Sequence, residues 1–364
     1  MDCQSLPEMD IGEWGEHLNT QLKGQRYPLS ATFEITERCN FNCVHCYINQ
    51  SAANKTARAE ELTTQQIKAI LDQIVDSGCL FLTLTGGEPL LREDFPQIYR
   101  YAKGKGMLVK IFSNAALISP AIIELFTELP PKDIDITLYG ATSEIYQQVT
   151  RTAYSYERVM GAIEQLISHQ LPFSLKTMVL TLNRHELNSL RQFSENLDRR
   201  FRYDSTIWPR LDGSLEPQNY QLSLEDKIDL EFEHEDVWQE WISLFERYQG
   251  KAMRSGPVYN CGAGLRSFHI DSRGRLSLCT AARNPAYDLN EMAFQEAWEN
   301  LGILRQKMRK LDTPCITCTL NDLCNLCPGW SQAVHGDDES PVEFLCQLAH
   351  MRFEKVVKYQ QSQH

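Results

Sequence analysis

The feature of this sequence that most constrains its fold is a repeated alternation of short apolar segments with helical ones. The apolar segments, which we interpret as strands, cover residues 31–36, 80–85, 107–112, 134–138, 173–180 and 206–208. Helical patterns follow around 64–75, 94–103, 119–128, 156–168 and 187–197, with apolar residues at helical spacing such as Ile67, Ile70 and Ile74. About six strand–helix units predict an α/β fold, whose parallel sheet is covered on both faces through right-handed crossovers.

Three cysteines in a C-x3-C-x2-C pattern, Cys39, Cys43 and Cys46, follow the first predicted strand, and His45 precedes the third of them. Cysteine is the usual ligand of 4Fe–4S clusters. Three thiolates bind three of the four irons, so the fourth iron stays open for a reactant. Structural zinc is the alternative, but zinc takes four ligands, usually as paired C-x2-C or mixed Cys/His sets. The residues between these cysteines offer no easy fourth ligand.

The second predicted strand runs directly into Gly86-Gly87-Glu88-Pro89. Glycines at a strand end let the backbone approach a ligand closely, and a carboxylate accepts hydrogen bonds from an ammonium group. Taken alone, the segment fits an ordinary turn equally well. Together with the cysteine triad it resembles the radical S-adenosylmethionine (SAM) enzymes. The resemblance implies a SAM-binding cluster on the triad, catalytic roles for its cysteines, and cofactor-binding roles for His45, Gly86, Gly87, Glu88 and Pro89.

The same resemblance implies a partial (β/α)6 TIM barrel, because residues 31–209 are too few for a closed eight-stranded barrel. Barrel enzymes place their chemistry at the carboxyl ends of the strands. Polar residues at the predicted strand ends are therefore further candidates, with capping or turn formation as the alternative role for each. We expect Ser113 and Asn114 to bind the SAM ribose and Arg151 to meet the SAM carboxylate. Tyr139, Arg210 and Asp212 are candidates for substrate contacts.

A second group of seven cysteines lies in the C-terminal part of the chain: Cys261, Cys279, Cys315, Cys318, Cys324, Cys327 and Cys346. The first two flank a predicted hairpin that turns near Arg273-Gly274. This order resembles the SPASM extension of radical SAM maturases, except that Cys324-x2-Cys327 is one residue shorter than usual. The resemblance implies two auxiliary 4Fe–4S clusters, so three in all. The distal one would use Cys315, Cys318, Cys324 and Cys346. The nearer one would use Cys261, Cys279 and Cys327 and keep an open iron. A zinc site on the paired C-x2-C motifs is the alternative.

Composition narrows the class of protein. The net charge of −12 argues against nucleic acid as a partner, because phosphate binding needs a basic surface. No apolar run approaches the ~20 residues of a membrane span, and residues 1–26 lack the apolar core of a signal peptide. Twelve cysteines in a chain this long fit metal clusters in a reducing cytoplasm better than a secreted disulfide scaffold. We expect an N-terminal extension (1–30), the barrel (31–222), a helical bridge (223–255), the SPASM domain (256–348) and a C-terminal helix or tail (349–364).

The function implied by the resemblance is reductive cleavage of SAM to a 5′-deoxyadenosyl radical, which then oxidatively modifies a ribosomally made precursor peptide. The product would be a cross-link, a thioether or an excised backbone segment. A radical SAM enzyme for small molecules or tetrapyrrole side chains is the alternative, and a non-catalytic iron–sulfur electron carrier is one from another class. A leader-binding domain needs at least ~50 residues and only about 30 precede the first strand, so we expect a separate leader-binding partner. A flavodoxin-type reductase would supply electrons.

Overall fold

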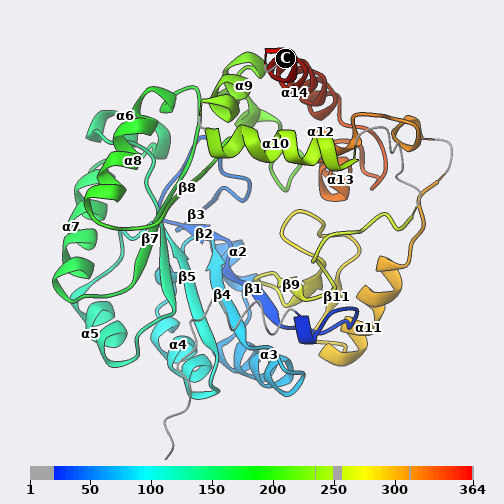
Figure 1. Cartoon of the computed structure of the whole chain (residues 1–364). Coiled ribbons are helices and arrows are strands. Elements are labelled where there is room, and N and C mark those ends of the chain that lie inside the picture. The colour runs from blue at the N-terminus through cyan, green and yellow to red at the C-terminus, as the bar shows by residue number, and fades with distance from the viewer. Residues whose placement is uncertain (1–19, 234, 249–255, 311–312, 363–364) are drawn as a thin grey trace, which may run out of the picture.

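The computed structural model describes residues 20–233, 235–248, 256–310 and 313–362. Six parallel strands form the main part of its sheet: β1 (Ser30–Thr36), β4 (Phe81–Gly86), β5 (Leu108–Ser113), β6 (Asp133–Thr137), β7 (Phe173–Met178) and β8 (Phe201–Asp204). Each of them pairs with the next in this order, and the curved sheet they form is visible in Figure 1. The predicted α/β class and partial barrel are confirmed.

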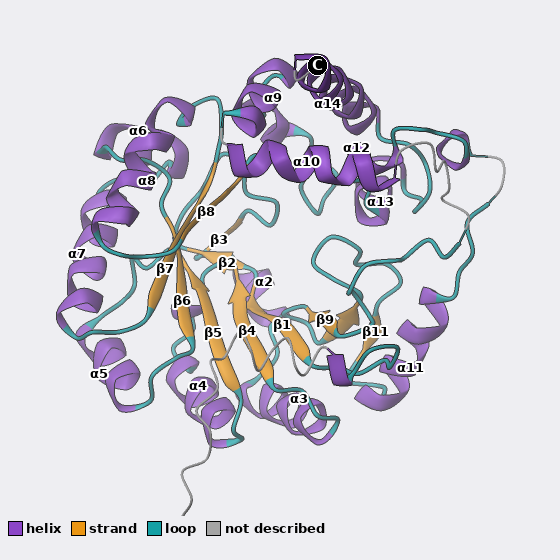
Figure 2. Ribbon diagram, in the orientation of Figure 1, coloured by secondary structure: helices purple, strands orange, loops and turns teal. Residues whose placement is uncertain are grey.

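The helices between these strands cover the outer face of the sheet (Figure 2). They are α3 (Thr64–Asp76), α4 (Phe95–Gly104), α5 (Pro120–Glu128), α6 (Ser143–Thr150), α7 (Ser155–Ser168) and α8 (Leu187–Asn196). The start of α3 is fixed by a capping box, in which Thr63 and Gln66 satisfy each other's backbone N–H groups. The apolar face predicted for this helix, which includes Ile67, Ile70 and Ile74, is buried against the sheet. Helix α6 has no counterpart in the sequence prediction.

The sixth strand was predicted at residues 206–208, and this prediction is wrong. The strand is β8, a few residues earlier, where half-buried and exposed residues alternate. Its charged residues Arg202 and Asp204 are tolerated because β8 lies at the edge of the sheet. The apolar residues after it lie in a loop, where the buried Ile207 donates its N–H to the Gln221 side chain and the half-buried Trp208 packs against Trp330.

The C-terminal cysteine-rich segment continues the barrel sheet through a hairpin. Strand β9 (Ser267–Ile270) runs parallel to β1, with Ser30 opposite Ser267 and Phe33 opposite Ile270. Strands β10 (Arg275–Ser277) and β11 (Tyr287–Asp288) then follow as antiparallel neighbours. The predicted hairpin is confirmed, and Gly274 takes a left-handed φ of 86° at its turn. The result is one nine-stranded sheet, ordered β11-β10-β9-β1-β4-β5-β6-β7-β8.

The bridge and the C-terminal part contribute further helices. The bridge contains α9 (Leu224–Phe232) and α10 (Glu235–Tyr248), and the C-terminal part contains α11 (Phe294–Arg305), α12 (Asn321–Cys324), α13 (Pro328–His335) and α14 (Glu343–Ser362). A separate apolar core joins α9, α10, α12 and α14, with Trp241 and Leu348 at its centre. The buried Arg352 of α14 binds both carboxylate oxygens of Glu231 at 2.7 Å. Within the described residues, no helix is long and apolar enough to cross a membrane.

Candidate SAM and cluster site

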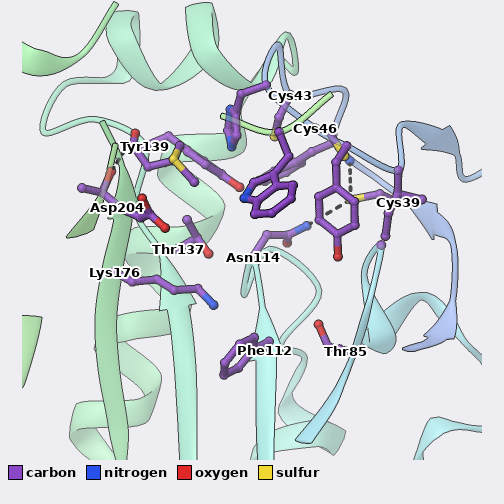
Figure 3. Close-up of a pocket in the computed structure, with 18 of the residues that line it drawn as sticks. Cys39, Cys43, Cys46, Thr85, Phe112, Asn114, Thr137, Tyr139, Lys176 and Asp204 are labelled. Atoms are coloured by element: carbon purple, nitrogen blue, oxygen red, sulfur yellow. Dashed lines mark hydrogen bonds between the residues drawn. The ribbon is translucent and has the colours of Figure 1, made fainter. Parts of the chain in front are cut away.

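A cavity of about 520 Å³ opens at the carboxyl ends of the barrel strands (Figure 3). Its wall includes all three triad cysteines, Cys39, Cys43 and Cys46, together with side chains from the ends of β4 to β8. This volume lies within the usual range of small-molecule sites. The position matches the place where barrel enzymes hold their substrates. The cavity is therefore the candidate active site.

The triad loop presents its sulfur atoms in a largely buried setting. Cys39 Sγ accepts hydrogen bonds from Phe41 N at 3.4 Å and Asn114 Nδ2 at 3.7 Å, and Cys46 Sγ accepts one from Asn49 N at 3.1 Å. Burial raises the pKa of Cys39 to about 12 and that of Cys43 well above its usual range. Such thiols become thiolates when bound metal offsets the cost of burying the charge.

The donor set fits an iron–sulfur cluster. Among the described residues, no three His, Cys, Asp or Glu side chains converge on a single-ion position. A cluster has a different requirement, because each cysteine binds its own iron and the sulfur atoms surround the cluster instead of converging on one ion. The three cysteines of the triad are arranged in this way, around the wall of one cavity. The buried Nδ1 of His45 has no hydrogen-bond partner among the described residues, so the wall also offers an unused polar atom.

Gly86 and Gly87 lie against the backbone of the strand that leads into the triad. Gly86 has a φ of 134°, and a Cβ there would be 2.0 Å from Thr36 O. A Cβ on Gly87 would be 2.2 Å from Arg38 O. Gly87 N donates to Thr36 O at 2.8 Å and Glu88 N to Arg38 O at 2.9 Å. Both glycines line the cavity, so glycine is needed for packing as well as for access.

We expect Gly86→Ala to destabilise the fold by at least about 2 kcal/mol, because it combines a strained φ with a backbone clash. Gly161→Ala is the matched control. Gly161 lies inside α7 with no atom within 4 Å of an added Cβ, and helix propensity predicts a gain of about 0.5–1 kcal/mol there. Chemical denaturation of the two variants measures both effects. Equal stability of the two variants would contradict this account of the Gly-Gly segment.

Glu88 is fully buried and connects the ends of β4 and β5. Its carboxylate accepts hydrogen bonds from Ser113 Oγ at 2.9 Å, Asn114 N at 2.7 Å and Leu90 N at 3.0 Å. Burial outweighs these donors and raises its pKa to about 7. A carboxylate has about four acceptor positions, so one remains. Its predicted contact with the SAM amino group stays a prediction.

Three of the other predicted cofactor residues, His45, Ser113 and Asn114, line the cavity. Tyr139, which was predicted as a substrate contact, lines it too, and its ring centroid lies 5.1 Å from that of His45. Pro89 is buried and begins the 3-10 turn Pro89–Leu91. Arg151 is not brought to the cavity: it takes a left-handed φ of 50° at the end of α6 and lies 3.7 Å from Glu216 and 3.1 Å from the Tyr220 hydroxyl.

Sequence reasoning missed a cation inside the cavity, Lys176 on β7. Its Nζ lies 3.4 Å from the buried Asp135 Oδ1. It also lies 3.5 Å from the centroid of the Phe112 ring, and both side chains are seen in Figure 3. Burial lowers its pKa to about 8. The available signal was a charged residue in the middle of a buried parallel strand, where apolar residues are the rule. Arg202 on β8 lines the same cavity and also pairs with Asp135.

A second cavity of about 750 Å³ lies between the strand ends and the C-terminal segment. It shares wall residues with the first, among them Tyr47, Asp204 and Trp208, so the two are neighbours. The predicted substrate residues Arg210 and Asp212 line this second cavity. Arg210 pairs with Glu216 at 2.8 Å, and Asp212 accepts from Ser214 N at 2.9 Å in the turn that follows.

The C-terminal cysteines gather into two groups. Burial, and then the charges of Cys327 and Cys261, raise the pKa of Cys279, which places these three near one another. The pKa of Cys346 is raised to about 11 by burial and then by four neighbours: Cys324, Cys315, Glu343 and Cys318. Their roles as ligands of two auxiliary clusters stay predictions. Cys79 belongs to neither group and is buried at the start of β4, and Cys3 lies outside the described residues.

Comparison with known proteins agrees with this geometry. Residues 33–193 match the model of the radical SAM superfamily. The AdoMet-dependent heme synthase of Methanosarcina barkeri is 27% identical over 86% of this chain and 95% of its own length. Mycofactocin maturase MftC of Mycolicibacterium smegmatis is 25% identical over 83% of this chain and 78% of its own. The structure of anSMEcpe with bound AdoMet and the Cp18Cys peptide superposes with a TM-score of 0.65 at 15% identity, covering 93% of this chain and 100% of that one.

Proposed function

We propose that this chain, a radical SAM enzyme with relatives among peptide maturases, oxidatively modifies a ribosomally made precursor peptide. The observation that carries the choice of substrate is the charge in the wall of the second cavity. Its three arginines are already paired with carboxylates, Arg210 with Glu216, Arg275 with Asp271 and Arg283 with Glu34. The same wall contains Glu37, Asp204 and Asp212. Among the residues that the structure describes, this wall has no arginine without a carboxylate partner that could bind a multiply charged anion, whereas a peptide backbone needs only neutral donors and acceptors.

In this proposal the triad holds the SAM-binding cluster. When bound, that cluster supplies the electron that cleaves SAM to methionine and a 5′-deoxyadenosyl radical. Gly86 and Gly87 leave room for the methionyl group, and Asn114 meets the ribose. Lys176 takes the carboxylate role first expected of Arg151, because its ammonium group lines the cavity. The rings of His45 and Tyr139 lie side by side in the cavity wall and shield that part of the site from water.

The proposal also includes the auxiliary clusters and the protein partners. The two C-terminal cysteine groups each bind a 4Fe–4S cluster, which brings the total to three. A flavodoxin-type reductase delivers the electron, and a separate small protein presents the leader of the precursor. A reducing cytoplasm fits this set, since it keeps unbridged cysteines available for metal.

One specific observation favours a second function, modification of a tetrapyrrole. The heme synthase relative matches along 95% of its own length. A tetrapyrrole with several carboxylate side chains would need unpaired cations in the second cavity, where each arginine has a carboxylate partner. The two substrates therefore require different groups in the wall of the second cavity: a peptide needs neutral donors and acceptors, and a tetrapyrrole needs unpaired cations.

The deciding experiment incubates anaerobically reconstituted, dithionite-reduced protein with SAM and one candidate substrate. The candidates are peptides encoded by short reading frames beside the gene and an iron tetrapyrrole bearing carboxylate side chains. We expect a peptide to raise 5′-deoxyadenosine formation above the substrate-free rate and to change mass, more so with the neighbouring small proteins added. Stimulation by the tetrapyrrole alone would favour the second function. Absence of SAM cleavage under every condition would favour the alternative function, a non-catalytic electron carrier.

A further inference from the structure

A fully buried carboxylate, Glu34 on β1, lies beneath the triad loop and is bound from three sides. It accepts a hydrogen bond from the Tyr47 hydroxyl at 2.9 Å. It accepts two more from the Arg283 guanidinium, at 3.0 and 2.7 Å. His269 Nε2 lies 3.4 Å from its second oxygen. A two-pronged Arg–carboxylate contact fixes orientation as well as charge.

These contacts join three separate segments of the chain. Tyr47 directly follows Cys46 in the triad loop. Arg283 belongs to the loop that begins with Cys279, and its Nε donates to Thr280 O at 2.9 Å. The Arg283 guanidinium also lies 5.7 Å from the centroid of the Tyr47 ring. A continuous path thus runs from Cys46 through Tyr47, Glu34 and Arg283 to the Cys279 loop.

The buried charge of Glu34 needs the cations that this path provides. A buried carboxylate without a cation is strongly unfavourable. Both positively ionisable partners of Glu34 among the described residues, Arg283 and His269, come from the C-terminal segment. Burial opposes ionisation, but these partners hold the pKa of Glu34 well below its usual range. The barrel strand therefore relies on the C-terminal segment to neutralise its own charge.

We propose that Arg283 is a positioning residue for the cysteine triad, which it holds through Glu34 and Tyr47. The C-terminal segment then shapes the SAM site in addition to carrying its own cysteines. This inference rests on the triad as the SAM-cluster site. It does not depend on whether the substrate is a peptide or a tetrapyrrole.

The test uses full-length protein, with two readouts. Thermal unfolding of the iron-free protein reports the fold. Electron paramagnetic resonance of the reconstituted, reduced protein, recorded with and without SAM, isolates the signal that SAM changes and hence the open cluster. Arg283→Gln should lower the unfolding midpoint and reduce the SAM-sensitive signal at least about tenfold, because it removes the two-pronged cation of the buried Glu34 and leaves only His269 beside it. Glu34→Gln/Arg283→Gln removes both charges and should recover most of the unfolding midpoint, while the SAM-sensitive signal stays low because the contact with the Cys279 loop is still broken.

Tyr47→Phe separates positioning from stability. It keeps the ring and removes only the hydroxyl that links the triad loop to Glu34. We expect a near-normal unfolding midpoint together with shifted g-values and a shifted reduction potential of the SAM-sensitive signal. Tyr101→Phe, which removes a hydroxyl bound to Asp72 at 2.8 Å on α3, and Arg100→Gln, which breaks the exposed pair with Glu128, are matched controls. A signal from Tyr47→Phe that matches the Tyr101→Phe signal would overturn the proposal, and so would a normal signal from Arg283→Gln.

Discussion

The wild-type chain, reconstituted with iron and sulfide without oxygen, is expected to hold about twelve irons, and its Cys39→Ala/Cys43→Ala/Cys46→Ala variant about eight. The variant should cleave no SAM at all. The three sulfur atoms share one cavity wall and would supply all the protein ligands of the open cluster. Without them no iron remains beside the Gly-Gly segment to pass an electron to SAM. Iron analysis and assay of 5′-deoxyadenosine after dithionite reduction measure the two losses.

Cys79→Ala provides the control for this experiment. Cys79 is 4% exposed and packs in the apolar core, and its thiol donates to the backbone oxygens of Leu29 at 3.7 Å and Phe81 at 3.5 Å. Its removal should leave both iron content and SAM cleavage unchanged. Residual SAM cleavage in the triple variant, at a rate comparable with that of Cys79→Ala, would rule out the triad as the SAM-cluster site.

The second large effect is expected from the group nearest the barrel. The Cys261→Ala/Cys279→Ala/Cys327→Ala variant should also lose about four of twelve irons, yet it should still cleave SAM. Its triad, Gly-Gly segment and Lys176 are untouched, so radical formation continues. Modified product should disappear, because electrons from the substrate radical would have no acceptor. Iron content, 5′-deoxyadenosine and the mass of the substrate are measured on the same sample.

The distal group supplies the comparison. Replacing Cys315, Cys318, Cys324 and Cys346 by Ala should remove a similar amount of iron, and parallel zinc analysis distinguishes the two metals. Zinc in these positions would refute the auxiliary-cluster assignment for the distal group. Full product formation by the Cys261/Cys279/Cys327 variant would show that the nearer group takes no part in turnover.

The sheet was largely predictable because strands buried on both faces appear as continuous apolar runs. Strand β8 was misplaced for the same reason, since an edge strand alternates and carries Arg202 and Asp204. The pairing of β9 with β1 could not be predicted from the sequence. It joins residues 30–33 to 267–270, and nothing local in either segment specifies a partner so far along the chain.

In the candidate site, too, local motifs could be predicted from the sequence and long-range contacts could not. The triad and the Gly-Gly segment are short motifs that follow predicted strands, so their positions could be predicted from the sequence and their roles from the family resemblance. Arg151 was expected to meet the SAM carboxylate because of its position in a loop. Instead it takes a left-handed conformation at the end of α6 and lies beside Glu216. Lys176 and the Glu34–Arg283 pair depend on which strand faces which. Partners 249 positions apart come together only through the folded sheet.

The pairing of β1 with β9 also limits how this protein can be divided for engineering. A fragment ending before the hairpin would leave one side of β1 without its neighbour, and Ala31 and Phe33 are fully buried in the intact chain. An uncovered apolar edge strand is a template for association with other chains. A chimera that exchanges C-terminal regions between enzymes of this kind should therefore keep β9–β11 with the barrel and place its junction after Asp288.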